Sequence, residues 1–341
     1  MVSTHPEQPP RRLTVVVPVH NEAENVGHLV ERVWSALAPG ASRWAAEILF
    51  VDDGSTDGTV ERIEDLRAAG QPVGYLQLSR NFGHQAAIAA GLSHAGGDVV
   101  VTMDGDLQHP PEQLPRMLLE FERGADVVQM VRVDPTAGSK GFFSTWFYRI
   151  FNRISDTRLV PNASDFRLLS RQVVEVVLRI PEREKFLRGL VPGLGFRQVQ
   201  LEFEELARLH GTPSYSFGSS LRLAQKALFQ YSAAPLKGVY YVGLFLAVTA
   251  FLSGIGHVVW KLLHWDDVVP GFTDTITAIF FLGGCMLVAI GTVGHYQLII
   301  LEQLRGRPAW IVQRQVRPPP GPTAPVDPGP RDPDPGRRGG A

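Results

Sequence analysis

The sequence predicts an α/β domain built on a mostly parallel sheet with helices on both faces, followed by helices that lie on and in a membrane. Three observations lead to this prediction. Apolar, β-branched runs alternate with segments of helical spacing through residues 13–131. Polar and acidic residues directly follow several of these runs. Residues 239–260 and 275–301 form long stretches without a formal charge.

The elements follow one another in a regular order. The expected strands cover residues 13–18, 47–51 and 73–78, the run that begins at Val99, and residues 125–131. Between them, apolar residues at helical spacing cover residues 26–37, a turn at residues 52–59 leads into a helix that extends to Leu66, and an alanine-rich helix extends to Ala95. This alternation is typical of a sheet covered by helices on both sides.

Composition limits the possible functions. The 341 residues include 33 basic and 34 acidic ones, so no overall charge favours a nucleic-acid partner. The single cysteine, Cys285, lies in an apolar run and excludes a disulfide framework or a cysteine zinc site within one chain. Residues 1–12 are polar and proline-rich and lack the apolar core of a signal peptide, so we expect them to be disordered and the following domain to be cytoplasmic.

Acidic residues stand just past the ends of the expected strands. In a parallel sheet the ligand lies at the carboxyl ends of the strands. We therefore expect Glu22, Asp53, Asp104 and Asp106 to converge at this edge of the sheet, which we call the rim. Asp104 and Asp106 share a face of the chain, with Gln108 within reach. These oxygen ligands suit Mg²⁺ or Mn²⁺ that carries a diphosphate. The simpler interpretation is a solvated acidic turn at a strand end.

The sequence also limits the type of nucleotide site. No G-x-G-x-x-G pattern follows the first strand, and no phosphate-binding-loop pattern occurs in the chain. A nucleotide would therefore be held by a metal ion and basic residues.

Residues 132–215 mix charged and aromatic residues. Lys140 lies near an aromatic stripe at helical spacing, which favours an amphipathic helix packed on the sheet over a helix at the membrane surface. Asp165 stands between apolar neighbours. Two interpretations of this acid stay open: a salt bridge to a nearby arginine, or a task in the reaction.

The C-terminal part predicts membrane association. Residues 216–236 fit an interfacial amphipathic helix, and the region 237–304 contains the two uncharged stretches, each long enough to span a bilayer. Two buried helices of a soluble domain are the weaker alternative. Basic residues flank the two stretches, whereas the loop between them is acidic, so the positive-inside rule places both flanks in the cytoplasm.

These observations divide the chain into five parts. They are a disordered N-terminus (1–12), a catalytic domain (13–215), an interfacial helix (216–236), a two-helix transmembrane region (237–304) and a cytoplasmic tail (305–341) that is disordered after about residue 317. We expect a multi-pass protein of the inner (plasma) membrane, with the catalytic domain and both termini in the cytoplasm.

Several motifs together resemble a known family. They are V-P-V-H-N-E (17–22), V-D-D-G-S-T-D (51–57), S-R-N-F-G (79–83), M-D-G-D-L-Q (103–108), D-F-R-L-L (165–169) and F-L-R-G-L (186–190). In this order, and with two C-terminal spans, they resemble family-two glycosyltransferases of the GT-A fold. Among these, the chain resembles the bacterial polyprenyl-phosphate glycosyltransferases, relatives of dolichyl-phosphate mannose synthase. The resemblance covers roughly residues 13–310.

The resemblance implies roles for individual residues. The donor-binding set is Pro18, His20, Glu22, Val51, Asp53, Asp104, Gly105, Gln108 and Lys140. The metal and diphosphate site comprises Asp104, Asp106 and Gln108. The groups implied for the transfer itself are Asp106, Arg132 near the phosphates, Asp165 near the acceptor phosphate, and Arg208.

The chain departs from the family pattern at several positions. Histidine replaces the frequent tyrosine at position 20, the frequent lysine or arginine at 84 and a common aspartate at 109. Ser214 stands where many relatives have lysine, and His295 replaces the glutamate of a frequent G-E-Y.

The reaction that the resemblance implies is a metal-dependent, inverting sugar transfer at the cytoplasmic face of the membrane. The donor is a nucleotide-diphospho-sugar and the acceptor a polyprenyl phosphate of the undecaprenyl or decaprenyl type. The expected partners are these two substrates and the lipid bilayer, with a homo-oligomer left open. One rival is a processive polysaccharide synthase, whose Q-x-x-R-W motif this chain lacks. The other is a catalytically silent membrane subunit, which the intact Asp104, Asp106 and Gln108 disfavour.

Overall fold

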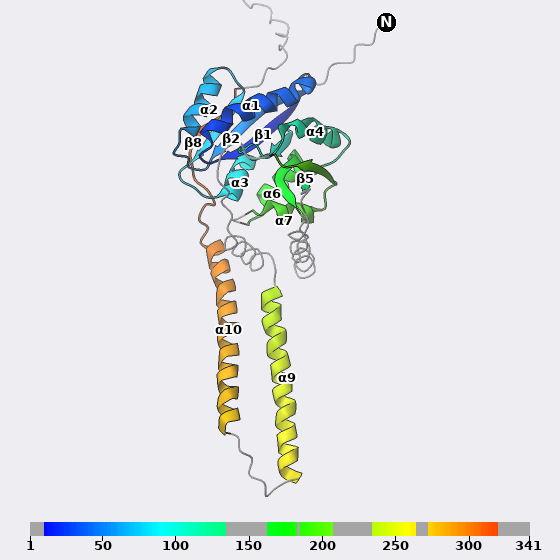
Figure 1. Ribbon diagram of the computed structural model, residues 1–341, viewed down its shortest axis with the longest axis vertical. Coiled ribbons are helices and arrows are strands. Elements are labelled where there is room, and N and C mark those ends of the chain that lie inside the picture. Colours follow the sequence, from blue (N-terminus) through cyan, green and yellow to red (C-terminus); the bar gives the residue numbers. More distant parts are fainter. Residues whose placement is uncertain (1–9, 134–161, 183–184, 207–233, 264–271, 320–341) are drawn as a thin grey trace, which may run out of the picture.

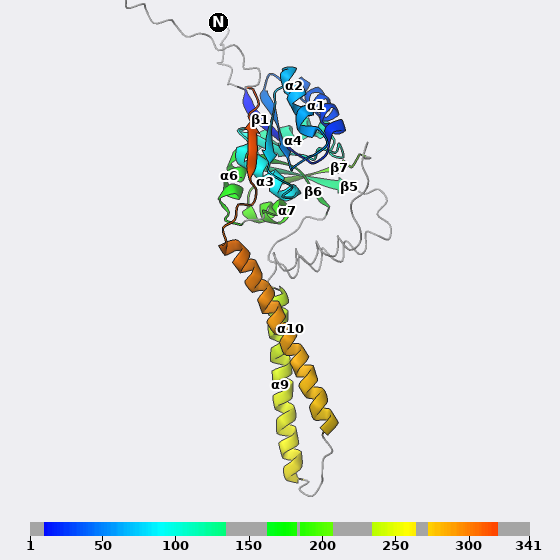
Figure 2. The same ribbon diagram turned by 90° about the vertical axis from the view of Figure 1, so that its left-hand side faces the viewer.

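The computed structural model describes residues 10–133, 162–182, 185–206, 234–263 and 272–319 (Figures 1 and 2). An α/β domain lies at one end of the molecule, and two long helices extend away from it side by side (Figures 1 and 2). The helices run in opposite directions, so that the start of the first and the end of the second both lie near the domain (Figure 1).

One mixed sheet forms the centre of the domain. Its strands lie in the order β7-β5-β6-β4-β1-β2-β3-β8. Their bounds are β1 Arg11–Val19, β2 Trp44–Asp52, β3 Val73–Leu78, β4 Val99–Thr102, β5 Val127–Val133, β6 Ala163–Ser170, β7 Gln198–Glu204 and β8 Val312–Val316. The five strands that the sequence predicts are all present. The sheet is mixed because β6 runs antiparallel between β4 and β5, and β8 runs antiparallel to β3.

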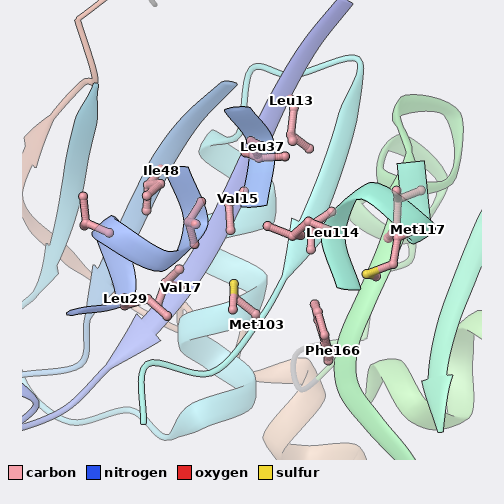
Figure 3. Close-up of a cluster of buried hydrophobic side chains, with 14 of the residues drawn as sticks. Leu13, Val15, Val17, Leu29, Leu37, Ile48, Met103, Leu114, Met117 and Phe166 are labelled. Carbon is pink, nitrogen blue, oxygen red and sulfur yellow. The ribbon is translucent and has the colours of Figure 1, made fainter. Parts of the chain in front are cut away.

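Helices cover both faces of this sheet, as the alternation predicts. Their bounds are α1 Ala23–Leu37, α2 Thr59–Ala68, α3 His84–His94, α4 Leu114–Glu122, α6 Arg171–Arg179 and α7 Leu187–Leu190. Successive side chains of a strand point to opposite faces. Val15 and Val17 of β1 accordingly join the core under α1, α2 and α4 (Figure 3), whereas Val16 joins the core under α3, α6 and α7.

The structure differs from the sequence analysis at both ends of the domain. The first strand begins at Arg11, inside the segment expected to be disordered, because the Arg11 N–H donates to the Arg43 carbonyl and Arg11 pairs with Trp44. At the other end, β8 lies within the expected tail and completes the sheet at its edge. The pattern V-Q-R-Q-V of β8 is half-exposed and polar, so no apolar run marks it in the sequence.

Two helices follow the domain, α9 (Ala234–Leu263) and α10 (Phe272–Leu304). Within the described residues, one stretch is long and apolar enough to cross a membrane, Phe281–Leu301 in α10, and α9 holds a shorter apolar stretch, Leu236–Leu246. The expected pair of spanning helices is therefore supported for one member only. The expected interfacial helix lies outside the described residues up to position 233.

Gly91 sets how closely α3 approaches the sheet. A Cβ atom at this position would lie 2.2 Å from Cγ1 of Val16 and 3.0 Å from Cγ2 of Val51. Both valines are buried in the core under α3. A larger residue would push α3 away from β1 and β2, and α3 begins at His84, next to the rim.

We predict that Gly91→Ala lowers the free energy of unfolding by about 1–3 kcal/mol, the usual cost of overpacking a core. For a domain of this size the midpoint of thermal unfolding would fall by roughly 2–12 °C. Gly193→Ala is the matched control, because nothing lies within 4 Å of a Cβ at Gly193. Equal midpoints for the two variants in detergent would contradict the close contact.

Candidate active site

The candidate site lies where the loops after β1, β2 and β4 meet the starts of α3 and β6. The D-x-D loop follows β4, which ends at Thr102. His84, the first residue of α3, connects this loop to β6: its Nε2 lies 3.2 Å from Oδ1 of Asp104 and 3.6 Å from Oδ2 of Asp165. The structure thus brings together two carboxylates that are far apart in the sequence, with a histidine between them.

Asp165 is the centre of a buried polar network. Its side chain is 1% exposed, and Oδ1 accepts hydrogen bonds from Nη2 of Arg167 (3.0 Å) and Nε of Arg188 (3.1 Å). Oδ2 accepts from Nη2 of Arg188 (2.8 Å) and Nε2 of Gln85 (2.9 Å). Of the two interpretations that the sequence left open, the structure thus supplies the salt bridge, with two arginines.

The charge state of Asp165 follows from these contacts. Burial would raise its pKa, but the hydrogen bond from His84 and the positive charges of Arg188 and Arg167 outweigh burial and hold the pKa of Asp165 well below its usual range. A carboxylate with so low a pKa and with both oxygens engaged is a poor general base at neutral pH. Its geometry suits a residue that positions its neighbours.

Arg167 and Arg188 differ in their surroundings. Arg167 is fully buried, and burial lowers its pKa to about 10 in spite of Asp165. Its Nε and Nη1 have no hydrogen-bond partner among the described residues. The side chain of Arg188, from α7, is 43% exposed and lies 2.8 Å from Oδ2 of Asp165. Arg188 therefore carries positive charge to the surface of the site.

His84 is a cation at neutral pH. Burial opposes its charge, but the hydrogen bonds and charges of Asp104 and Asp165 outweigh burial and raise the pKa of His84 to about 10. A cation at the N-terminus of α3 is disfavoured by the helix dipole, so the two carboxylates must offset this effect as well. The same contacts act on Asp104: burial opposes its ionisation, while His109 and His84 lower its pKa.

His109 supports the backbone of the D-x-D loop. Nδ1 of this buried histidine accepts a hydrogen bond from the Asp104 N–H (2.9 Å), and its Nε2 lies 2.6 Å from Oγ of Ser164. The ring stacks on Phe166 with centroids 5.1 Å apart. His109, at the position of a common aspartate in the family, thus supports the loop backbone.

The D-x-D loop forms a tight turn. Oδ1 of Asp106 accepts a hydrogen bond from the Gln108 N–H (3.1 Å), and Leu107 adopts a positive φ of 63°. Such a φ is uncommon for leucine and is typical of functional loops. A Cβ on Gly105 would lie 2.7 Å from Cγ1 of Val19, so glycine at position 105 lets this loop pass close to the end of β1.

The carboxylates of the D-x-D loop could hold a divalent cation whose remaining coordination positions are filled by a bound phosphate. The described residues contain no group of three or more His, Cys, Asp or Glu side chains that could hold a metal ion. Mg²⁺ commonly takes one or two carboxylates from the protein and fills its other positions with phosphate oxygens and water. Asp106 and the 29% exposed side chain of Asp104 match this pattern.

On the other side of the rim, Asp53 serves mainly to build a loop. Its carboxylate oxygens accept hydrogen bonds from the backbone N–H groups of Phe82 (2.7 Å) and Gly83 (2.9 Å), and the residue is 4% exposed. These contacts fix the loop that leads into α3. A role of Asp53 toward a nucleoside stays a prediction.

The remaining expected donor residues lie around the same rim. Pro18 and Val51 are buried near the ends of β1 and β2, and His20 is exposed. Glu22 accepts a hydrogen bond from Nδ2 of Asn25 and precedes α1. Their roles toward a donor, like that of Gln108, are not decided by these positions.

The basic residues expected near phosphates are placed only in part. Nη2 of Arg132 lies 2.7 Å from Oε1 of Glu205, so Arg132 forms a half-exposed ion pair at the end of β5. Lys140 and Arg208 lie outside the described residues. Sequence reasoning overlooked His84, Gln85 and Arg188 as site residues, although the S-R-N-F-G and F-L-R-G-L motifs contain or adjoin them.

Comparison with known proteins gives a consistent family. Residues 14–178 match Glycosyl transferase family 2. The SfII prophage-derived bactoprenol glucosyl transferase of Shigella flexneri is 34% identical over 310 residues, which cover 90% of this chain and 99% of the relative. The prophage bactoprenol glucosyl transferase homolog of Escherichia coli is 33% identical over 310 residues, with 89% and 99% covered.

Two solved structures of low sequence identity also align with the chain. The mannosyltransferase PcManGT of Pyrobaculum calidifontis, in complex with GDP-Man and Mn²⁺, is 15% identical with a TM-score of 0.45 and covers 89% of this chain and 92% of its own. Glucosyl-3-phosphoglycerate synthase of Mycobacterium tuberculosis is 19% identical with a TM-score of 0.42, with 64% and 78% covered. From the sequence relatives, the chain belongs to glycosyl transferase family 2 and is a glycosyltransferase.

Proposed function

We propose that this glycosyltransferase moves a sugar from a nucleotide-diphospho-sugar to a polyprenyl phosphate at the cytoplasmic face of the plasma membrane. The observation that carries the proposal is the similarity to proteins named bactoprenol glucosyl transferases over 89–90% of this chain, well beyond the α/β domain. The product would be a polyprenyl-phospho-sugar. The identity of the sugar is left to experiment.

The rim supports a metal-dependent reaction. Asp106 and Asp104 would hold Mg²⁺ or Mn²⁺ together with the donor diphosphate. A divalent cation in this place supplies a Lewis acid that stabilises charge on the departing diphosphate. The Asp106–Gln108 turn and the support from His109 keep the two carboxylates in place before any ligand binds.

The acceptor needs no strong base. A phosphate monoester has a second pKa near 6, so it is largely dianionic at neutral pH and is itself a nucleophile. This matches an Asp165 that is tied to Arg188 and Arg167 and has a depressed pKa. Asp165 would position the cations His84 and Arg188, which in turn would offset the negative charge of the substrates.

The helices support attachment to a lipid bilayer. Large apolar side chains on both are open to the surroundings, among them Phe245 (67%) and Leu287 (73%). Such exposure is costly in water and favourable in lipid. In the proposed topology α9 and α10 both span the membrane, and the loop between them lies outside the cell.

Sugar transfer can be measured directly with the purified full chain. We expect one radiolabelled UDP-, GDP- or dTDP-sugar to label polyprenyl phosphate and move into the organic phase. A processive synthase would instead give a water-soluble or insoluble polymer, and a silent subunit would transfer nothing from any of the donors.

Asp106→Ala should reduce transfer by at least about a hundredfold, because it removes a ligand of the ion that stabilises developing charge. Chelation with EDTA should have a similar effect on the unaltered enzyme, and added Mg²⁺ or Mn²⁺ should restore activity. Asp65→Ala, at an exposed position of α2, is the control and should transfer normally. Full activity in EDTA without a divalent metal would exclude the metal role.

Asp165→Asn should destabilise the domain by about 3–5 kcal/mol, because Arg167 then keeps a buried charge without its partner. The folded-state pKa of Asp165 is depressed, so its contribution is present above the unfolded pKa of about 3.9 and is lost as the pH falls through the lower, folded-state value. The difference in thermal midpoint between the unaltered protein and Asp165→Asn should therefore be largest at pH 7 and should decrease below about pH 4.

The control for this measurement is Glu175→Gln, which breaks an exposed ion pair with Arg179 on α6. An exposed pair of this kind contributes at most about 1 kcal/mol. If Asp165→Asn were as stable as this control at pH 7, the carboxylate would not be the anchor that its contacts indicate.

Topology can be tested by labelling single cysteines in a Cys285→Ser background. A cysteine at Asp267, between the two helices, should react with an impermeant thiol reagent in intact cells, and a cysteine at Ala324 in the tail should react only after lysis. The basic flanks predict this pattern. The opposite labelling would place the active site outside the cytoplasm.

A further inference from the structure

The chain after α10 returns to the α/β domain and joins its sheet. α10 ends at Leu304, and β8 begins at Val312 (Figure 2). The Arg305 N–H still donates to the Leu301 carbonyl, and Gly306 then turns the chain with a φ of 57°. Even fully extended, residues 305–311 span only about 3.5 Å each, so the end of α10 stays near the edge of the sheet.

The contact between β8 and the sheet is extensive. β8 pairs antiparallel with β3 from Tyr75↔Val316 to Leu78↔Val312, and the Ser79 N–H donates to the Ile311 carbonyl (2.9 Å). A bulge between Gln77 and Leu78 shifts the register. As a result Val312 packs on the core under α3, whereas Val316 packs on the opposite core.

Side chains reinforce the pairing on both sides. Trp310 packs against the core under α3. Nη1 of Arg314 lies 2.8 Å from Oε1 of Glu64, and its guanidinium lies 5.6 Å from the ring centre of Tyr75. A Cβ on Gly74 would come within 2.6 Å of Pro318 and the Val316 carbonyl, so glycine permits this close approach. The segment is held at many points, and we name residues 305–316 the strap.

The strap is attached next to the rim. β3 ends at Leu78, and its next residue, Ser79, hydrogen-bonds the strap and begins the loop that leads to α3. In that loop the N–H groups of Phe82 and Gly83 hold Asp53. α3 then starts with His84, which contacts Asp104. A short, ordered path therefore leads from the end of a membrane helix to the residues of the candidate site.

From this path we infer that the strap fixes the height and rotation of the rim relative to α10, and hence to the membrane surface. The inference rests on the proposed lipid acceptor. The phosphate of such an acceptor stays at the bilayer surface, so a rim held at the right place meets it at a high effective concentration. A domain that could swing away would lose the orientation on which transfer depends.

The test lengthens the strap without disturbing β8. An insertion of about twelve glycine and serine residues between Gly306 and Arg307 would add roughly 20 Å of flexible chain. The same insertion after Pro319, beyond the strap, is the matched control. Transfer is measured with long-chain polyprenyl phosphate in vesicles and with a short-chain, water-soluble isoprenyl phosphate, and thermal unfolding of each protein is recorded.

We expect the insertion in the strap to lower kcat/KM for the lipid in vesicles by about tenfold or more. For the soluble acceptor, and for both acceptors in the control, kcat/KM should stay within about twofold. Unchanged transfer in vesicles would overturn the inference. An equal loss with both acceptors would also overturn it, because the connection would then support the site itself.

The unaltered enzyme separates this inference from the proposed function. If it transfers sugar to neither acceptor, the proposed acceptor is wrong, and the inference falls with it. If it uses both acceptors and only the comparison of the two insertions fails, the proposed function stands and the strap has no positioning role.

Discussion

A carboxylate that is withdrawn from water must be offset by cations and hydrogen-bond donors, and the arrangement around Asp165 follows from this requirement. Its partners come from three elements: Arg167 from β6 itself, Arg188 from α7, and His84 with Gln85 from α3. Each contact therefore also fixes where one of these elements lies. Asp165 thus holds Arg188 and, together with Asp104, His84 at the surface of the site.

The mixed sheet explains why this carboxylate lies beside the D-x-D loop. β6 runs antiparallel to β4, and Thr102, the last residue of β4, pairs with Arg167. The chain that leaves β4 therefore passes the residues that precede Arg167, Asp165 among them. Asp104 and Asp165 would repel each other in these surroundings, and His84 between them removes that cost.

Much of the fold follows from short-range sequence patterns. Alternating apolar runs and helical spacing predict the five strands and the helices between them, and the residues past the strand ends predict the rim. The antiparallel β6 and the edge strand β8 could not be predicted, because the D-F-R-L-L run gives no direction and V-Q-R-Q-V has no apolar face. Strand direction and edge pairing depend on contacts between distant segments.

The contacts of Asp165 could likewise be predicted from the sequence only in part. Arg167 lies two residues away on the same face of β6, so a salt bridge was one of two interpretations open from the sequence. Arg188, Gln85 and His84 come from α7 and α3, and only the packing of these helices on the sheet brings them to Asp165. The sequence contains these residues in recognisable motifs, but nothing local connects them to an acid.

Charge balance at the rim connects the network with the chemistry. In the network around Asp165, the carboxylates Asp104 and Asp165 contact the cations His84, Arg167 and Arg188. His109 acts on the D-x-D loop through the backbone of that loop, because its Nδ1 accepts a hydrogen bond from the Asp104 N–H.

These cations are already paired with carboxylates of the protein, so they would offset only part of the charge that the diphosphate of a donor and the phosphate of an acceptor add. Bringing these anions together requires additional positive charge. In the proposed reaction, a divalent cation that binds with the donor would supply that charge. The pairing of buried carboxylates with fixed cations is therefore compatible with the proposed dependence of transfer on a metal ion.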